Sequence, residues 1–361
     1  MEIHNCEPNW LQRLLTSSSY SPKVIGSDYQ PLGTSWKTRV AESSLSDRRL
    51  YQYVSSECDG ETTVIVAGGW CTRRGIRCND IFERSLVTDT LKCISRRAEW
   101  SPRHSFSFLG KRNGGMLYII GGDDGSIRSD VWVSSDRARS FRRVCEEAAW
   151  KGRIDFSAAL VGDVIVICGG RIPRHGGLDS YLNDVWISHD RGASWTQACN
   201  HAAWKPRSGC AMVAIGTDLL MLGGQGEVSA FDDTWISRDL GATWAPSSTK
   251  RIPWKPRKSP KVLLDPISNE LLLIGGFGAD GAVLSDSWAS IDRGVSWIPR
   301  NHLPEEVLPD AAATATHNGA VFVLGTKAES QTVSDLRFVK NDCLFILMVG
   351  SRLESVIPRD L

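Results

Sequence analysis

The stretch DVIVICGGRIPRHGGLDSYLNDVWISHDRGASWTQACNHAAWKPR, residues 163–207, contains the pattern that decides the fold. An apolar run ends in Gly-Gly, and a variable loop leads to Asp-Val-Trp. A Ser-x-Asp-x-Gly-x-Ser-Trp element follows, and the stretch closes on Trp-x-x-Arg. Short runs rich in Val and Ile, separated by Gly, Pro and Asp, are typical of β-strands. The stretch therefore predicts a unit of four short strands, a to d.

The same order of motifs recurs about every fifty residues. Each apolar run is followed by an Asp-x-aromatic segment, and no stretch shows helical periodicity. Four strands in each of about six units predict an all-β fold, a β-propeller of six four-stranded blades. A seven-bladed ring with one degenerate blade is the alternative. The apolar runs are TTVIVAGG (62–69), MLYIIGG (116–122), DVIVICGG (163–170), DLLMLGG (217–224), ELLLIGG (270–276) and the degenerate AVFVLGT (320–326).

One propeller over residues 21–349 accounts for the chain, with an irregular segment at 1–20 and a tail at 350–361. LGTSW (32–36) resembles a strand d that has no blade of its own. We therefore expect residues 24–40 to supply the strand that closes the ring. The degenerate third strand of the sixth unit is expected at Asp335–Phe338. The seven-bladed alternative instead uses WLQR (10–13) and CLFILMV (343–349).

The repeat resembles the kelch repeat, on the residues SPRHSFSF, LYIIGG and SDVW of the second unit. The resemblance covers roughly residues 45–340, and the central domain of galactose oxidase shares the pattern. The Ser-x-Asp-x-Gly-x-Ser/Thr-Trp element is similar to the Asp-box of sialidases. The kelch resemblance implies a non-enzymatic scaffold that binds a protein or peptide partner.

Residues that recur in every blade are expected to be structural, because a single active site needs only one copy of each catalytic group. In SHDRGASW (188–195), Asp190 is expected to accept hydrogen bonds from turn amides two residues on. Gly192 supplies a positive φ, and Trp195 covers the blade edge. The other structural residues are Asp239, Gly241, Trp244, Asp292, Gly294, Trp297, Gly69, Gly122, Gly170, Gly224, Gly276, Trp132, Trp186, Trp235 and Trp288.

A recurring arginine begins each strand a. These arginines are expected to bond a neighbouring carboxylate or carbonyl, with the repeated Asp130, Asp184, Asp233 and Asp286 as candidates. A ring of arginines that faces a ligand is the alternative. The arginines are Arg103, Arg153, Arg207 and Arg257.

Function is expected in the loops between strands b and c, because the blades differ there and these loops emerge at one end of a propeller. Their charged residues make that end basic on one side and acidic on the other, which suits a protein or peptide partner. Solvated loops without a partner are the alternative. The candidate binding residues are Arg73, Arg74, Arg77, Arg171, Arg174, His175, Tyr181, Glu227 and Asp232.

The main alternative function is a carbohydrate-binding or sialidase-like glycoside hydrolase propeller. A glycosidase needs an arginine cluster and paired carboxyls. RIP (171–173) resembles the Arg-Ile-Pro signature of sialidases, but it follows a Gly-Gly of the third unit instead of opening the first blade. The histidines and tyrosines do not group as copper ligands. We therefore expect no catalytic residues, no metal and no cofactor.

The 361 residues have a formal net charge of +1, which gives no overall attraction to nucleic acid or membrane. The stretch MEIHNCEPNWLQRLL has no basic segment followed by an apolar one, so we expect no secretory signal. Ten scattered cysteines without a CxxC pair indicate a reducing, cytoplasmic location. Cys168 and Cys210 are expected to be buried thiols, whereas Cys71 and Cys78 leave a disulfide or metal pair open. We expect a monomer.

Overall fold

The computed structural model describes residues 36–41, 48–58, 61–300, 313–317, 320–326 and 342–347, apart from 87, 89, 112–113, 175–177, 249–250 and 266–267. These residues form strands and turns, with no helix among them. The strands are β1 (Trp36–Ala41), β2 (Arg48–Arg49), β3 (Gln52–Cys58), β4 (Glu61–Cys71), β5 (Ile76–Ser85), β6 (Leu91–Ser95), β7 (Ser107–Gly110), β8 (Leu117–Asp123), β9 (Ile127–Ser134), β10 (Arg142–Cys145), β11 (Ser157–Val161), β12 (Val164–Cys168), β13 (Arg171–Ile172), β14 (Ser180–Tyr181), β15 (Val185–Ser188), β16 (Thr196–Cys199), β17 (Ala211–Ile215), β18 (Asp218–Leu222), β19 (Thr234–Ser237), β20 (Ala245–Pro246), β21 (Lys261–Leu264), β22 (Leu271–Ile274), β23 (Ser287–Ser290), β24 (Ile298–Arg300), β25 (Ala313–His317), β26 (Ala320–Thr326) and β27 (Asp342–Leu347).

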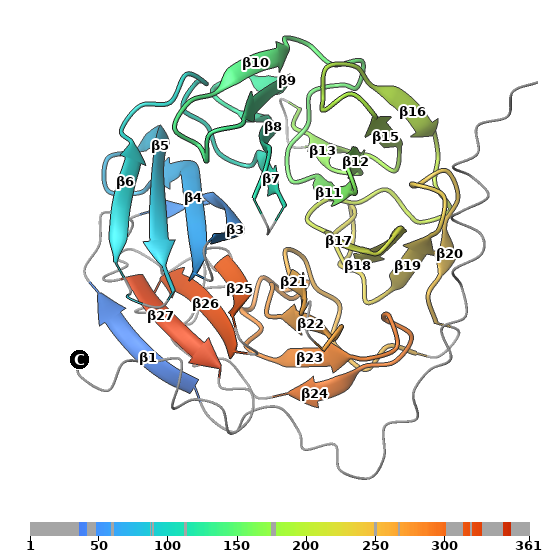
Figure 1. The fold of residues 1–361 in the computed structure, drawn as a ribbon. Helices are drawn as coiled ribbons and strands as arrows, with labels where there is room; N and C mark the ends of the chain where they lie inside the picture. Colours follow the sequence, from blue (N-terminus) through green and yellow to red (C-terminus); the bar gives the residue numbers. More distant parts are fainter. Residues whose placement is uncertain are drawn as a thin grey trace, which may run out of the picture. The chain divides into compact units, whose positions relative to one another are not determined.

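Five antiparallel blades follow one another between β2 and β24. In the first blade, β3 pairs with β4, β4 with β5 and β5 with β6, and the short β2 also pairs with β4. The other four blades have the strand orders β7–β8–β9–β10, β11–β12–β15–β16, β17–β18–β19–β20 and β21–β22–β23–β24. Figure 1 shows the strands a near the centre and the strands d outside. The predicted all-β propeller is confirmed.

The sequence predicts six or seven blades, whereas the structure describes five blades with their side chains. A further sheet has the order β1–β27–β26–β25 and joins strands from both ends of the chain. In it, β26 pairs with β27, so residues 342–347 occupy the third place. That place was expected for Asp335–Phe338, and the seven-bladed alternative used 343–349 as strand d instead. Residues 335–338, 10–13, 1–20 and 350–361 lie outside the described residues.

The hydrophobic core lies between consecutive blades, because one four-stranded sheet cannot cover both of its own faces. The cluster between the second and third blades joins Ile120 and Val131 to Ile165, Ile167 and the strand-d Trp195. Equivalent clusters fill the first–second, third–fourth and fourth–fifth interfaces. The Trp of each Trp-x-x-Arg motif is buried and meets the aromatic at the head of strand d edge-on.

A buried arginine pairs with the strand-c aspartate in every one of the five blades. In the second blade, Arg103 Nη1 and Nη2 lie 2.6 and 2.9 Å from Asp130, and Nη1 also donates to the Gly121 carbonyl at 2.9 Å. Trp132 Nε1 donates to the same carboxylate at 2.8 Å. The other pairs are Arg48–Asp80, Arg153–Asp184, Arg207–Asp233 and Arg257–Asp286. Each pair fixes strand a to the Gly-Gly of strand b and to strand c.

The Ser-x-Asp-x-Gly elements form the turns between strands c and d, but their bonds differ from the expected Asx turn. Asp190 Oδ1 accepts from the amide of Ser194, four residues on, at 2.8 Å. The amide of Gly192, two residues on, donates instead to the Ser188 hydroxyl at 2.8 Å. Trp195 Nε1 donates to the Gly192 carbonyl at 3.2 Å. The serine hydroxyl takes the near amide, so the carboxylate reaches further along the turn.

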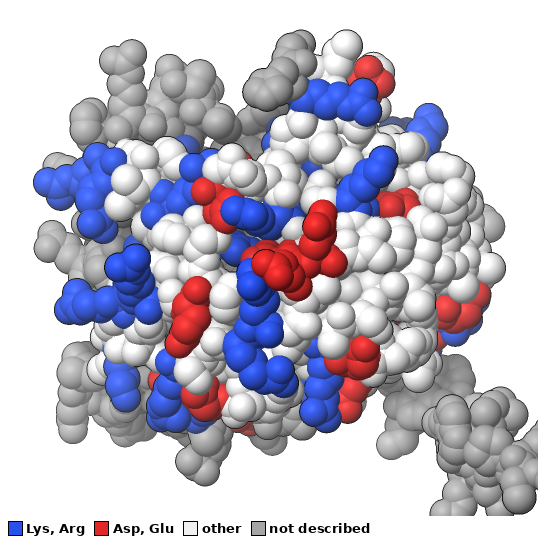
Figure 2. Space-filling view, turned by 90° about the horizontal axis from the view of Figure 1, so that it is seen from above, with Lys and Arg blue, Asp and Glu red and all other residues white. Residues whose placement is uncertain are grey.

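Figure 2 views the edge of the molecule that lies at the top of Figure 1, where β10 is, and shows basic and acidic side chains side by side. In the described part of the chain, no helix is long and apolar enough to cross a membrane.

Candidate functional site

One backbone arrangement repeats in all five blades near the centre of the ring, where strand a begins and strand b ends. We call it the constant frame. In each blade, the residue after the buried arginine pairs with the residue after Gly-Gly. The pairs are Arg49–Trp70, His104–Asp123, Ile154–Arg171, Ser208–Gln225 and Lys258–Phe277. The backbone geometry therefore repeats, while the side chains at these positions differ in every blade.

The next residue of each blade adopts a left-handed backbone conformation. The φ values are 52° at Leu50, 53° at Ser105, 53° at Asp155, 60° at Gly209 and 54° at Ser259. A residue with a side chain pays about 1 kcal/mol for this conformation. Backbone bonds link three neighbours, from Gly209 N to Asp155 O at 2.7 Å and from Ser259 N to Gly209 O at 2.6 Å. The left-handed residues thus form part of a collar around the centre.

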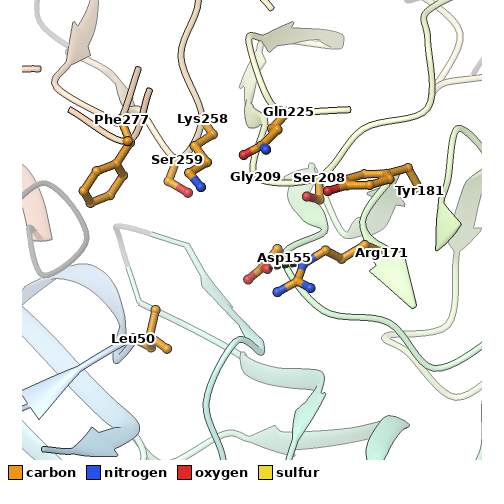
Figure 3. Close-up of a pocket in the computed structure, with 11 residues that line it drawn as sticks. Leu50, Asp155, Arg171, Tyr181, Ser208, Gly209, Gln225, Lys258, Ser259 and Phe277 are labelled. Atoms are coloured by element: carbon orange, nitrogen blue, oxygen red, sulfur yellow. Dashed lines mark hydrogen bonds and ion pairs between the residues drawn. The ribbon is translucent and has the colours of Figure 1, made fainter. Parts of the chain in front are cut away.

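A cavity of about 400 Å³ opens on this collar, and unrepeated residues line it. Figure 3 shows Asp155, Arg171 and Tyr181 of the third blade on one side and Lys258, Ser259 and Phe277 of the fifth blade across from them. The fourth blade adds Ser208, Gly209 and Gln225, and Leu50 comes from the first blade.

The charges around this central cavity are unequally paired. Arg171 Nε lies 3.0 Å from Asp155 Oδ2, and Arg171 Nη1 also bonds Asp179. Burial opposes the charge of Arg171, but the two carboxylates raise its pKa above the ordinary value. Lys258 forms no ion pair with any described residue, whereas Arg171 is held by two carboxylates.

A second cavity, of about 480 Å³, adjoins the first and shares Tyr181 with it. It lies between the b–c loops of the third and fourth blades, with Phe231, Glu227 and Val228 among its lining residues. Val228 is 94% exposed. Burial raises the pKa of the Tyr181 hydroxyl above its ordinary value. The two cavities together offer apolar and charged contacts on one end of the propeller.

The structure brings together some of the sequence-predicted residues. Arg171 and Tyr181 line the central cavity, and Tyr181 and Glu227 line its neighbour. Asp232 is half-buried and lines neither. Arg174 is exposed, and its backbone amide donates to Asp179 at 3.4 Å. His175 lies outside the described residues.

The three arginines of the first b–c loop do not act as one group. Arg77 Nη2 bonds Asp123 of the second blade at 2.9 Å, and its guanidinium lies 5.6 Å from the Trp70 ring centre. Arg73 and Arg74 lie at the exposed tip. Arg77 therefore links two blades, while Arg73 and Arg74 are exposed to solvent.

The sequence interpretation missed Asp155, Ser208, Lys258, Ser259 and Phe277. Their signal is positional: they lie one or two residues after the repeated arginine or directly after the Gly-Gly, where the units differ in residue type. The sequence motifs predict variable residues in the longer b–c loops alone.

The family described as the KLHDC2/KLHL20/DRC7 Kelch-repeats domain matches residues 55–276, which is more than half of the chain. The chain belongs to the kelch-repeat family. The kelch domain has no match among the curated proteins. The matched range ends at the second glycine of ELLLIGG, so the family pattern covers the blades that frame most of the central cavity.

The central cavity offers little of what a glycosidase needs. Such enzymes place two carboxyl groups about the scissile bond, and among the described lining residues Asp155 is the single carboxylate. The described residues contain no cluster of three or more His, Cys, Asp or Glu that could hold a metal ion. Cys71, Cys78, Cys168 and Cys210 are buried free thiols.

Proposed function

We propose that this kelch domain is a non-catalytic interaction module that binds a protein or peptide partner in the central cavity. The observation that carries the proposal is the constant frame with different side chains: five equivalent backbone positions hold five different residue pairs. Packing alone would favour the same residue in each blade, as it does for the buried arginines. Variation on a fixed scaffold is how binding surfaces acquire specificity.

The cavity chemistry favours a partner segment with an acidic group beside an apolar one. Lys258 supplies an unpaired cation, and Ser208 and Ser259 supply hydroxyl groups beside it. Leu50 and Phe277 offer apolar contact across the same cavity. An aromatic or aliphatic anchor in a cavity of this kind contributes most of the affinity in many interfaces.

The b–c loops extend the proposed surface. Arg73 and Arg74 on the first loop are exposed, and Glu227 and Val228 border the second cavity. A partner longer than the central cavity would contact these loops, with its acidic side toward the arginines. A cytoplasmic location and a monomeric state stay predictions.

A carbohydrate-binding propeller is the second candidate function. Tyr181 and Phe277 place aromatic rings on two sides of the central cavity, and aromatic faces are common contacts for apolar sugar faces. The c–d turns also resemble the sialidase Asp-box in sequence. The peptide proposal takes precedence because a neutral sugar would leave Lys258 without a counter-charge.

We further propose that the ring has six blades and that β1 closes it as the outer strand of the sixth. In support, β1 pairs antiparallel with β27 from Trp36–Leu347 to Ala41–Asp342. Contacts between inner strands run from β3 through β7, β11, β17 and β21 to β25, and β25 in turn contacts β3. Joining both chain ends in one blade would couple the folding of all the others.

The partner proposal is tested by quantitative affinity purification with matched variants. We expect Lys258→Glu and Ser259→Glu each to reduce capture of the same partner about tenfold, because each adds negative charge inside the cavity, which repels an acidic segment. Arg238→Glu is the control, since Arg238 is exposed on a c–d turn at the opposite end. The proposal fails if every protein retained by the wild type is retained equally by both cavity variants.

A further inference from the structure

The outer edges of the first and second blades carry cations that have no acidic partner. Lys92 lies on β6, Arg96 and Arg97 follow that strand, Arg139 lies in the c–d turn of the second blade, and Arg142 begins β10. All five are exposed, and none forms an ion pair with a described residue. We call these five residues the rim cations.

The acidic side chains nearby are already engaged. Glu83 pairs with Arg137 at 2.7 Å, and Glu146 pairs with Arg143 at 3.1 Å. Asp136 accepts the amide and hydroxyl of Ser140 within its turn. Glu99 Oε2 accepts the amide of Phe141 at 3.0 Å. Bonds from amides and hydroxyls leave Asp136 and Glu99 ionised, but the five rim cations together with Arg137 and Arg143 still outnumber the five carboxylates Glu83, Glu99, Asp136, Glu146 and Glu147.

A cavity of about 310 Å³ lies within this rim, between β6 and the c–d turn of the second blade. Its lining includes Lys92 and Arg139, the Glu83–Arg137 pair and the half-buried Ile94. Two unpaired cations beside an apolar side chain form a site for a carboxylate next to an aliphatic group. Figure 2 shows basic side chains over the edge where β10 lies and to its left, on the side of β6.

The fold itself does not require these charges. Charged residues on outer strands can prevent sheets from pairing edge to edge. However, β16, Thr196–Cys199, has the same length as β10 and carries no charged residue, and β20 is Ala245–Pro246. The outer strands of the third and fourth blades therefore lack charged residues that would prevent edge-to-edge pairing. Protection of strand edges thus does not explain why the rim of the first two blades is basic.

We propose that this rim binds an acidic, partly aliphatic segment of a partner protein, at a site separate from the central cavity. Nucleic acid fits less well, because its continuous line of phosphates would extend beyond the rim cavity and pass the exposed Glu146 and Glu147 that follow β10, whereas a short acidic segment can end within the cavity. An anionic membrane also fits less well, because none of the exposed large hydrophobic residues described lies on β6 or β10.

The test measures fluorescence anisotropy of a labelled Glu-Glu-Leu-Glu-Glu-Leu-Glu-Glu peptide at low salt, where surface charges are least screened. We expect the wild-type chain to bind the peptide and to show no binding to the same peptide with Gln in place of Glu. Lys92→Glu/Arg139→Glu should raise the dissociation constant at least about tenfold, and Lys92→Gln/Arg139→Gln should raise it less.

Two controls separate this site from general charge and from the central cavity. Lys151→Glu/Arg238→Glu makes the same charge change at exposed residues away from the rim cavity and should bind as the wild type does. The Lys92/Arg139 variants are also compared in a Lys258→Glu background, which removes the cation of the central cavity, so the two proposals can fail independently. The rim proposal is overturned if the peptide does not bind, if the Lys92/Arg139 variants bind it unchanged, or if duplex DNA or phosphatidylserine vesicles bind more tightly.

Discussion

At the scale of single residues, the buried arginine and its aspartate are the most costly features of each blade. A guanidinium that loses water must regain bonds from the protein. Arg103 does so with Asp130, Gly121 and Ser101, and it is 1% exposed. The pairs are not equally shielded, since Asp130 is 9% exposed whereas Asp233 is 36% exposed. Their contributions to stability should differ accordingly.

Arg103→Met should lower the free energy of unfolding by about 3–5 kcal/mol, because it leaves the Asp130 carboxylate buried without its cation. Arg207→Met should cost less, since water can reach the Asp233 carboxylate. Urea unfolding followed by tryptophan fluorescence measures both variants. Equal losses would show that burial of the partner carboxylate does not govern the cost.

The structural residues were predictable from the sequence because they repeat, and the cavity residues were not because they do not. Five double glycines and five Asp-x-aromatic stations in register are sufficient to predict strands, their order and the scaffold role of the arginines. Nothing in Lys258-Ser259 or Ile154-Asp155 reveals a left-handed residue facing a cavity. That position becomes meaningful only when the blades surround a common centre.

At the scale of elements, the c–d turn is where one blade packs against the blade before it. Gly192 has a φ of 88°, and a Cβ there would lie 2.7 Å from Val131 Cγ1 of the second blade. Gly162 has a φ of 60°, but a Cβ there would meet nothing within 4 Å. The two glycines thus share a backbone requirement and differ in the packing requirement.

Gly162→Ala should cost about 1 kcal/mol of stability, which is the price of the left-handed conformation alone. Gly192→Ala should cost at least about 1 kcal/mol more, because either the turn or Val131 must move. Thermal and urea unfolding of the two variants provide the comparison. A Gly192→Ala loss no larger than that of Gly162→Ala would mean that the turns do not set the spacing between blades.

At the scale of the whole molecule, the proposed binding function depends on a ring that carries different residues at equivalent positions around its centre. The proposed closure by β1 gives the ring its stability, because an unclosed blade would leave its neighbours with uncovered apolar faces. The central cavity and the rim cations lie on different parts of that ring. The domain is therefore proposed to hold two partner segments at once.

Removal of residues 32–41 tests the closure. If β1 completes the sixth blade, the truncated chain should unfold at a markedly lower urea concentration, and adding a synthetic peptide of residues 32–41 should restore part of the difference. Amide hydrogen exchange of β27 should rise in the truncated chain, since β27 would lose its partner strand. Unchanged exchange in β27 would rule out closure by this strand.

The most direct test of the central claim is photo-crosslinking from inside the central cavity. A photoreactive phenylalanine analogue replaces Tyr181, which lines both cavities, or Lys111, which lies in an a–b turn at the opposite end. The account predicts that a protein partner is crosslinked from position 181, that Lys258→Glu abolishes this crosslink, and that position 111 yields none. Crosslinking from position 111 but not from 181 would contradict it.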